Sequence, residues 1–462
     1  MLPALFGSDR KIFYGWYIVA GGIVINMLSG GLVMHSFNFY VAELKSEFMW
    51  SATLFGVAFM ITRIESGVLG PIQGWLIDRF GPQTMMRFGL LSTFIGLLAF
   101  SQLNSQATFI GFYFVVAIGA SVGGFMTVSV AVVTWFERKR SRALGFMSTG
   151  FALGGFMTPL VSWLIEDFGW RNTAIASAII LFVVGQILAT LFVRRPQDRG
   201  LMKDGEPPPV DGSASRVLQQ GNEFRHRDFT VREAMRTKAF WGLALAHGAP
   251  LLVVSGVFVH FASLVIEIEG LTVVHASLAY TAMNVAQLIG QVGMGYMGDR
   301  FSKRALLIPA MFGHAGAAVM LAFAGSFEVV MLAAIINGLA WGSRAPLITG
   351  LRADYFGASN FGKIMGWSSI VMSTFMTIGG FLSGVLFDAT GSYTVPFVVL
   401  GVGALSGVLW VGMSGRPRLP GVRVIGASGP LSRAQPIAMF RPNRPAANPS
   451  ARSATQRSGI ER

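Results

Sequence analysis

The sequence predicts an all-α membrane protein: twelve transmembrane helices in two six-helix bundles that are related by a parallel pseudo-two-fold repeat. Three observations lead to this fold class. The composition is 53% hydrophobic and 13% charged, whereas a soluble domain carries about 25% charged residues. Apolar runs long enough to cross a bilayer follow one another along the chain, and the same residues recur at equivalent places in its two halves.

The apolar runs set the number of helices. A helix rises ~1.5 Å per residue and the hydrocarbon core of a bilayer is ~30 Å thick, so about 20 apolar residues span it. Runs of that length, numbered here as the first to the twelfth span, lie at 14–38, 51–76, 85–103, 108–135, 144–166, 173–193, 240–264, 275–298, 305–325, 328–350, 364–387 and 394–413.

The basic residues indicate how these spans are oriented. An even number of spans places both termini on one side, and the segments on that side hold 32 of the 36 Lys and Arg residues. The opposite loops hold Lys45 and Arg171, while Arg63 and Arg344 lie inside spans. Because positive residues gather on the cytoplasmic side, we expect cytoplasmic termini and a plasma-membrane location of the bacterial inner-membrane type. The net charge of +14 then reflects topology and indicates no nucleic-acid partner.

The polar stretches divide the chain into four parts. We expect an N-terminal six-helix bundle at 14–193, a cytoplasmic linker loop at 194–239, a C-terminal six-helix bundle at 240–413 and a basic, disordered cytoplasmic tail at 414–462. The linker is rich in Pro, Gly and charge. The tail has nine Arg and no periodic apolar face, so it is either solvated or in contact with anionic lipid.

An internal repeat relates the two predicted bundles. The segment Gly74-Trp75-Leu76-Ile77-Asp78-Arg79-Phe80-Gly81 follows the second span, and Gly295-Tyr296-Met297-Gly298-Asp299-Arg300-Phe301-Ser302 follows the eighth. Equivalent residues are 221 positions apart in the pairs Asp78 and Asp299, Asp167 and Asp388, and Gly145 and Gly366. Phe136 and Phe356 are 220 apart. Because six is even, both halves have the same orientation, as in transporters built from parallel repeats.

The repeated Gly-x-x-x-Asp-Arg-x-Gly element resembles the signature loop of the major facilitator superfamily, and the resemblance covers about residues 14 to 413. Further motifs are similar to the monocarboxylate and oxalate–formate branch: Tyr14-Gly15-Trp16-Tyr17, Trp135-Phe136 before Arg142-Ala143-Leu144-Gly145, Gly169-Trp170-Arg171, and Asp354-Tyr355-Phe356-Gly357 before Phe361-Gly362. The resemblance implies transport of small carboxylates by proton symport or anion exchange. It also implies a cavity lined by the first, fourth, seventh and tenth helices. Where oxalate-type members carry a cation in the eighth helix, this sequence offers Asn284.

The second span contains two ionisable residues, and such groups inside a bilayer usually mark function. At about 100° per residue, Arg63 shares a helix face with Gly67, Gly70 and Gly74. A glycine face permits close helix packing, so we expect Arg63 at the contact between the bundles, binding substrate or gating. A structural ion pair or a carbonyl-capped Arg is the alternative. Glu65 lies on the apolar side and is a candidate proton carrier, or else a neutral or ion-paired residue inside the N-terminal bundle.

The tenth span carries a further arginine. Asn337, Trp341 and Arg344 fall on one helix face, and Pro346 follows, which predicts a local break. Because an Arg binds a carboxylate with two parallel hydrogen bonds, we interpret Arg344 as the anion anchor and Trp341 as a cover for the apolar part of the solute. A gate role for Arg344 is the alternative. His247, on the seventh span, is a candidate ligand whose alternative role is helix packing.

The signature loops have a mechanical interpretation. Asp78 and Asp299 end their helices, where each can accept hydrogen bonds from the backbone N–H groups at a helix start in the facing bundle. Together with neighbouring arginines they would form clamps that break when the cytoplasmic side opens. A plain turn with topogenic charges is the alternative. The gating candidates are Gly74, Asp78, Arg79, Gly81, Asp299 and Arg300.

Patterns typical of enzymes are absent from the sequence. The segment 357–364 nearly matches a phosphate-binding loop, but Ile364 stands where Ser or Thr must bind magnesium. The chain has no Cys, which excludes thiolate metal sites, and neither zinc-ligand spacing nor a serine-hydrolase elbow occurs. We therefore expect no enzyme activity, no cofactor and no metal.

These observations together predict a secondary active transporter that moves a small organic anion by alternating access. Protons or a counter-solute would supply the coupling, and membrane lipid is the other expected partner. Efflux of amphipathic or drug-like compounds is the second hypothesis. Deep acidic residues, which would suit cationic compounds, are fewer than deep arginines. A non-transporting membrane sensor is the third hypothesis.

Overall fold

The computed structural model describes residues 12–50, 52–205 and 228–418, and inside its helices a few side chains, including that of Arg63, lie outside the described part. The chain forms one compact unit up to Pro420. The second unit, Gly421–Arg462, lies outside the described residues. Most of the predicted tail and the middle of the predicted linker, 206–227, are therefore outside the description as well.

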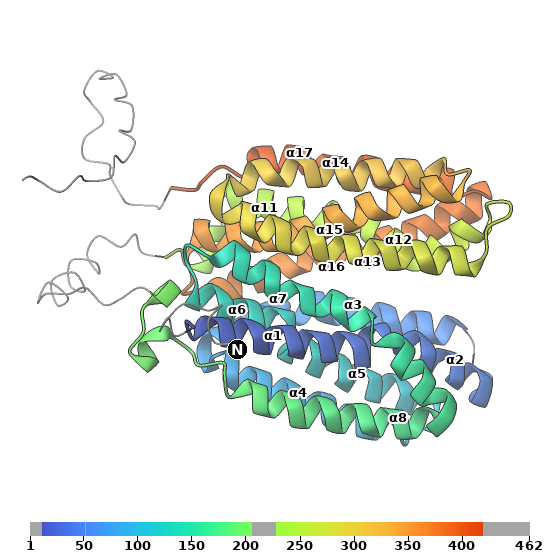
Figure 1. Cartoon of the computed structure of the whole chain (residues 1–462), viewed down its shortest axis with the longest axis horizontal. Helices are drawn as coiled ribbons and strands as arrows, with labels where there is room; N and C mark the ends of the chain where they lie inside the picture. Colours follow the sequence, from blue (N-terminus) through green and yellow to red (C-terminus); the bar gives the residue numbers. More distant parts are fainter. Residues whose placement is uncertain (1–11, 51, 206–227, 419–462) are drawn as a thin grey trace, which may run out of the picture. The chain divides into compact units, whose positions relative to one another are not determined.

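All regular elements in the described ranges are helices (Figure 1). The first part of the chain forms α1 (Gly15–Ser29), the π-helix η1 (Gly30–His35), α2 (Phe37–Phe48), α3 (Ala52–Phe80), α4 (Pro82–Phe100), α5 (Gln106–Gly123), α6 (Phe125–Trp135), α7 (Arg140–Gly155) and α8 (Thr158–Ala189). Short 3-10 helices η2 (Pro196–Arg199) and η3 (Lys203–Gly205) follow. The second part forms α10 (Val231–Met235), α11 (Lys238–Gly248), α12 (Leu251–Ile266), α13 (Val273–Arg300), α14 (Lys303–Ala322), α15 (Phe327–Phe356), α16 (Phe361–Thr390) and α17 (Thr394–Met413).

Each predicted span coincides with helix, although several boundaries differ. Among the described residues, nine helical stretches are long and apolar enough to cross a membrane. The helices α3 and α13 are not among the nine, and both bury polar side chains, Gln73 on α3 and Gln291 on α13. The all-helical membrane class is therefore confirmed, whereas twelve crossings and the two-fold repeat remain predictions.

One local expectation needs correction. The break predicted at Pro346 is wrong, because α15 runs through that residue without interruption. Proline lacks the N–H that would bond the carbonyl of Gly342, but membrane helices tolerate this where neighbouring helices pack closely, and Gly342 lies directly against the backbone of Gln287 on α13. Breaks occur elsewhere: at Gly124 inside the fourth span and at the junction of α11 and α12 inside the seventh.

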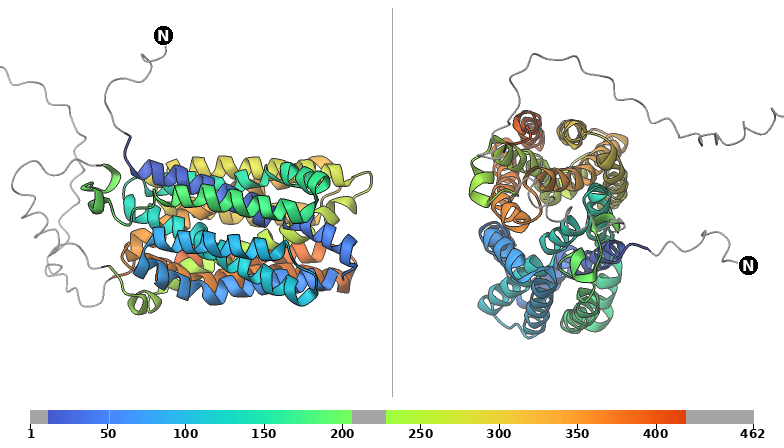
Figure 2. Two further views of the ribbon diagram at one scale, coloured as in Figure 1. Left: turned by 90° about the horizontal axis from the view of Figure 1, so that it is seen from below. Right: turned by 90° about the vertical axis from the view of Figure 1, so that its left-hand side faces the viewer.

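The helices before and after the linker pack mainly among themselves. In the first group α4 packs on α5 and α8, and α1 packs on α7; in the second, α13 and α14 pack on α15, α12 packs on α16, and α17 packs on α11 and α14. Contacts between the groups, called the seam here, join α3 to α16 and α7 to α13 and α15 (Figures 1 and 2).

Glycines make the seam close. A Cβ on Gly70 or on Gly74 of α3 would collide with the start of α16, at Gly366 and Gly362 respectively. On the other side, a Cβ on Gly145 of α7 would collide with the backbone of Gln291 of α13. Small residues of this kind let membrane helices approach backbone to backbone. The glycine face predicted on the second span is confirmed as a packing face.

Candidate functional site

Arg344 lies in the interior of the second helical group. Its side chain, on α15, is 1% exposed. One guanidinium nitrogen, Nη1, donates a hydrogen bond of 2.6 Å to the backbone carbonyl of His247 on α11. Its Nε has no hydrogen-bond partner among the described residues. This carbonyl cap uses only part of the donor capacity of the guanidinium.

Arg352, eight residues further along α15, is a second buried arginine that the sequence interpretation missed. It is also 1% exposed. Its Nη2 lies 3.5 Å from the carbonyl of Leu243 and 3.4 Å from Nδ1 of His247. The apolar run of the tenth span ends at residue 350, which places Arg352 among the cytoplasmic charges. Extending the helix to Gly357, the next residue that favours a helix end, would have found it.

No carboxylate lies within 4.0 Å of either guanidinium in the described ranges, where the ion pairs involve other basic residues. Transferring an unpaired charge from water to an apolar interior costs several kcal/mol. Three donor atoms of the two arginines, Nε of Arg344 and both Nε and Nη1 of Arg352, lack a partner there. This arrangement can bind an anion that enters from outside the protein.

The other residues predicted on the tenth helix differ in their surroundings. The amide of Asn337 is buried and bonds Nδ1 of His314 on α14 at 2.8 Å and the sulfur of Met283 on α13 at 3.4 Å. Trp341 is half-buried. The side-chain amide of Asn284, on α13, donates a hydrogen bond of 3.1 Å to the carbonyl of Tyr280 within its own helix. Among the described residues, Arg344 and His247 are the only predicted solute-binding residues that hydrogen-bond each other.

Of the two ionisable residues predicted on α3, the structure describes the side chain of Glu65 but not that of Arg63. The side chain of Arg63 lies outside the described part, so its predicted place at the seam stays a prediction. Glu65 is 5% exposed, and its Oε2 accepts a hydrogen bond of 3.0 Å from the hydroxyl of Ser66. Its Oε1 is without a partner in the residues described. A buried carboxyl of this kind can hold a proton.

The signature loops lie together at one end of the helices, called the signature-loop end here. The carboxylate of Asp78 accepts backbone hydrogen bonds from Gly362 (3.1 Å) and Lys363 (3.0 Å) in the first turn of α16. The carboxylate of Asp299 accepts from Ser141 (2.8 Å) and Arg142 (3.2 Å) in the first turn of α7. The first-turn N–H groups of a helix have no intrahelical partner and favour negative charge. The predicted contacts of both aspartates across the seam are confirmed, whereas gating itself stays a prediction.

The remaining signature residues have different surroundings. Gly81 has a φ of +86° between α3 and α4, a conformation that requires glycine. The guanidinium of Arg194 donates a hydrogen bond of 2.7 Å to the backbone carbonyl of Asp78. Arg79 is exposed and lies over the ring of Trp75, 5.1 Å from its centre. Arg300 is also exposed.

A second set of seam contacts was missed by the sequence interpretation. Asp354, at the end of α15, binds Nη1 of Arg140 at 2.6 Å and Nζ of Lys303 at 2.7 Å. Arg140 starts α7 and Lys303 starts α14, so one carboxylate joins three helices across the seam. The sequence signal was weak, because these residues fall between the predicted spans, where many charges lie.

The two ends of the linker are fixed near the same helix starts. Asp204 accepts backbone hydrogen bonds from Glu137 (3.0 Å), Arg138 (2.8 Å) and Lys139 (3.2 Å), just before α7. Asp228 accepts one of 2.9 Å from Ser359, just before α16. The two loops that present the helix starts to Asp299 and Asp78 are therefore held from their own side of the seam.

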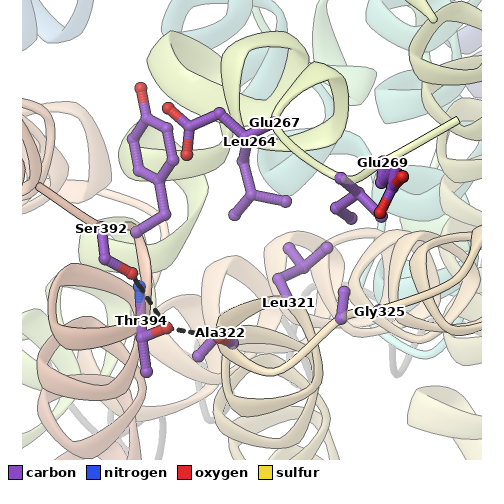
Figure 3. A pocket seen from close by; sticks show the side chains of 11 residues that line it. Leu264, Glu267, Glu269, Leu321, Ala322, Gly325, Ser392 and Thr394 are labelled. Carbon is purple, nitrogen blue, oxygen red and sulfur yellow. Dashed lines mark hydrogen bonds between the residues drawn. The ribbon is translucent and has the colours of Figure 1, made fainter. Parts of the chain in front are cut away.

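A cavity of about 340 Å³ lies at the opposite end of the second helical group (Figure 3). Leu264, Glu267 and Glu269, around the end of α12, form one wall, and Leu321 and Thr394 form the other. The charged residues that line this cavity are acidic, so it does not suit an anion. Its lining shares no residue with the arginine cluster on α15.

Comparison with known proteins identifies the class. The family model described as Major Facilitator Superfamily matches residues 19–279 and 264–447. The chain belongs to the major facilitator superfamily. It is accordingly a membrane transporter, since the family and the similar structures are transporters and not enzymes.

Individual transporters are similar to this chain over most of their length. The chain is 28% identical to MFS transporter asaE of Aspergillus flavus over 86% of this chain and 85% of the relative. It is 25% identical to monocarboxylate transporter 13 of Bos taurus (85% and 88% covered). It is 27% identical to the Fujikurins efflux protein of Gibberella fujikuroi (85% and 80% covered). The predicted resemblance to the monocarboxylate branch is thus confirmed.

Solved structures agree on the fold. The chain resembles the proton:xylose symporter XylE with a TM-score of 0.69 at 17% identity, over 86% of this chain and 95% of that one. At this identity the likeness concerns the fold alone.

Proposed function

We propose that this protein is a secondary active transporter of small organic anions that works by alternating access. The observation that carries the proposal is the pair of buried guanidiniums on α15, each 1% exposed and neither within 4.0 Å of a carboxylate in the part of the chain that is described. A site with surplus positive charge in an apolar interior selects anions and rejects cations. Arg344 is the anchor of the solute, and the backbone carbonyl of His247 fixes the position of the Arg344 side chain.

The proposed scaffold has twelve membrane crossings in two six-helix bundles, 14–193 and 240–413, related by a parallel repeat. The equivalent use of repeat-related residues supports this arrangement: Asp78 caps α16, and Asp299, 221 positions later, caps α7. In this scheme the linker, the tail and both termini are cytoplasmic, in a plasma membrane. The signature-loop end is then the cytoplasmic end, and it is closed by Asp78, Asp299 and Asp354.

Transport requires this end to open. We propose that rocking of the two bundles breaks the carboxylate contacts to the starts of α7 and α16, and exposes the arginine cluster to the cytoplasm. Glu65 is the candidate for proton coupling, because one of its carboxyl oxygens is buried without a partner among the described residues. Arg63 is a candidate for a second solute contact on α3. Trp341, Asn337 and Asn284 remain candidates for lining the site.

Uptake in reconstituted vesicles tests the proposal. Purified protein in proteoliposomes is assayed against radiolabelled small carboxylates, and the Arg344→Gln variant is compared with Arg171→Gln, an exposed arginine paired with Glu47. Loss of one charged partner costs about 2–5 kcal/mol, so uptake by Arg344→Gln should fall about a hundredfold, while Arg171→Gln keeps the parent rate. Equal uptake by both variants would refute the role of Arg344.

Efflux of amphipathic compounds is the second candidate function, supported by the likeness to the Fujikurins efflux protein. The same vesicles distinguish the two. Efflux predicts competition by bulky apolar compounds and indifference to small carboxylates, whereas anion transport predicts the reverse.

A further inference from the structure

Arg352 has more hydrogen-bonding capacity than the described residues satisfy. Its two contacts, 3.5 Å to the carbonyl of Leu243 and 3.4 Å to Nδ1 of His247, both involve Nη2. Both are longer than the usual N–H···O distance of about 2.7–3.2 Å. Its Nε and Nη1 are buried without any partner among the described residues. A guanidinium that is fully buried and so weakly bonded is poised for a stronger acceptor.

His247 brings the two arginines together. Its carbonyl accepts from Nη1 of Arg344 at 2.6 Å, and its ring nitrogen Nδ1 faces Nη2 of Arg352. Because a guanidinium only donates, Nδ1 must accept, which leaves the imidazole neutral with its proton on Nε2. The histidine therefore adds no charge of its own. The two cations flank one neutral residue and repel each other through it.

The surroundings make that repulsion significant. The same stretches of α11 and α15 carry buried apolar residues of one hydrophobic cluster, including Leu243, Leu347 and Leu351. In such a low-dielectric setting charges interact more strongly than in water. A single carboxylate bound at Arg344 would leave the charge of Arg352 uncompensated, whereas a solute with two acidic groups would neutralise both.

We infer that Arg352 is the second arm of the solute site, and that the transported solute carries two acidic groups, one for each arginine. This inference rests on the proposed anion transport and adds the charge of the solute to it. Arg352 lies two residues before Asp354, the residue that joins α15 to α7. The second arm of the site is therefore next to contacts that must break when the signature-loop end opens.

Competition assays on the full-length protein test the inference. Unbranched α,ω-dicarboxylates of two to six carbons and monocarboxylates of the same lengths compete for uptake, or, where no labelled substrate is transported, for thermal stabilisation of the purified protein. We expect at least one dicarboxylate to compete about ten times more strongly than the monocarboxylate of the same length. This is the effect of one additional charge-assisted contact. In Arg352→Gln this preference should fall to within about twofold.

Two further variants separate binding from folding. Arg352→Lys retains the charge and should keep part of the preference for dicarboxylates, whereas a purely structural arginine would give equal losses in both variants and in both solute series. Arg171→Gln should leave the preference unchanged. The inference is overturned if no dicarboxylate exceeds its matched monocarboxylate, or if Arg352→Gln retains the preference. Either result, with uptake of monocarboxylates still dependent on Arg344, would leave the proposed anion transport intact.

Discussion

Two groups of basic residues contact the second half of α15, and they differ in whether a carboxylate pairs with them. At the signature-loop end, Arg140 and Lys303 both bind the carboxylate of Asp354. Two residues earlier on the same helix, Arg352 begins the cluster with Arg344, in which no carboxylate takes part within the described ranges. Arg140 and Lys303 thus have a carboxylate partner, whereas Arg344 and Arg352 contact only neutral acceptors among the described residues.

The difference separates a structural from a ligand-binding use of the same side chains. A paired cation gains less from a solute, because its charge is already compensated by a carboxylate. An unpaired buried cation is a source of instability that an incoming anion relieves, and that relief is the binding energy. In the proposed mechanism, ion pairs at one end of α15 hold the signature-loop end closed, and the adjacent arginine cluster is left without a negative charge.

The largest effect should follow from giving the cluster an internal carboxylate. The substitution His247→Glu keeps the backbone carbonyl that caps Arg344 and places an acid between the two guanidiniums. We expect a raised melting temperature and a loss of anion uptake of about a hundredfold, because an internal carboxylate competes with the solute at very high effective concentration. Differential scanning fluorimetry and vesicle uptake measure the two quantities. His247→Gln, which adds no charge, should not raise the melting temperature; an equal rise in both would contradict the charge argument.

Removing the carboxylate of Asp354 from the signature-loop end should have an effect of intermediate size, in that this end opens more often. Asp354→Asn leaves Arg140 and Lys303 without their partner, so the signature-loop end should open more often. The parent chain has no cysteine, so Ser141→Cys provides a unique thiol, at a site on α7 that is 0% exposed when closed. The rate of maleimide labelling should rise about fivefold, since a partly exposed ion pair contributes about 1 kcal/mol. An unchanged rate would show that these ion pairs do not hold the end closed.

A smaller effect is expected at the helix starts. Asp299→Asn removes the charge but keeps an acceptor for the N–H groups of Ser141 and Arg142. A charge at a helix start contributes about 0.3–1 kcal/mol, so labelling at Ser141→Cys should rise by about two- to threefold. Asp204→Asn is the matched control, because Asp204 bonds the preceding loop from the same side of the seam. Equal acceleration by both would mean that loop order, and not contact across the seam, controls opening.

Much of this architecture follows from local patterns in the sequence. Apolar runs of bilayer length and the segregation of basic residues do not depend on the tertiary fold, which is why the helical class and the helix positions could be predicted. The contact of Asp78 with a helix start in the facing bundle could be predicted as well, because the glycine face of α3 and the repeated motif place the aspartate at a crossing helix; that this helix is α16 was not predicted. The predicted break at Pro346 failed, since packing against α13 decides whether a helix tolerates proline.

The site was harder to predict, because its key property is a missing partner. Whether Arg344 or Arg140 is paired depends on residues about a hundred or more positions away, such as His247 and Asp354. Arg352 escaped notice because a run of apolar residues underestimates the length of a helix whose last turns are buried by protein and not by lipid. Asn337 was placed correctly on the face of Arg344, but its bond to His314 arises from a packing choice that no spacing reveals.

The most direct test is to measure whether anions stabilise the protein through this cluster. Purified protein is melted in sodium salts of small carboxylates and in sodium chloride of equal ionic strength, beside the double variant Arg344→Gln, Arg352→Gln. Carboxylates should raise the melting temperature of the parent protein and leave that of the double variant unchanged. An equal rise in the double variant would contradict the proposal that these buried arginines bind the solute.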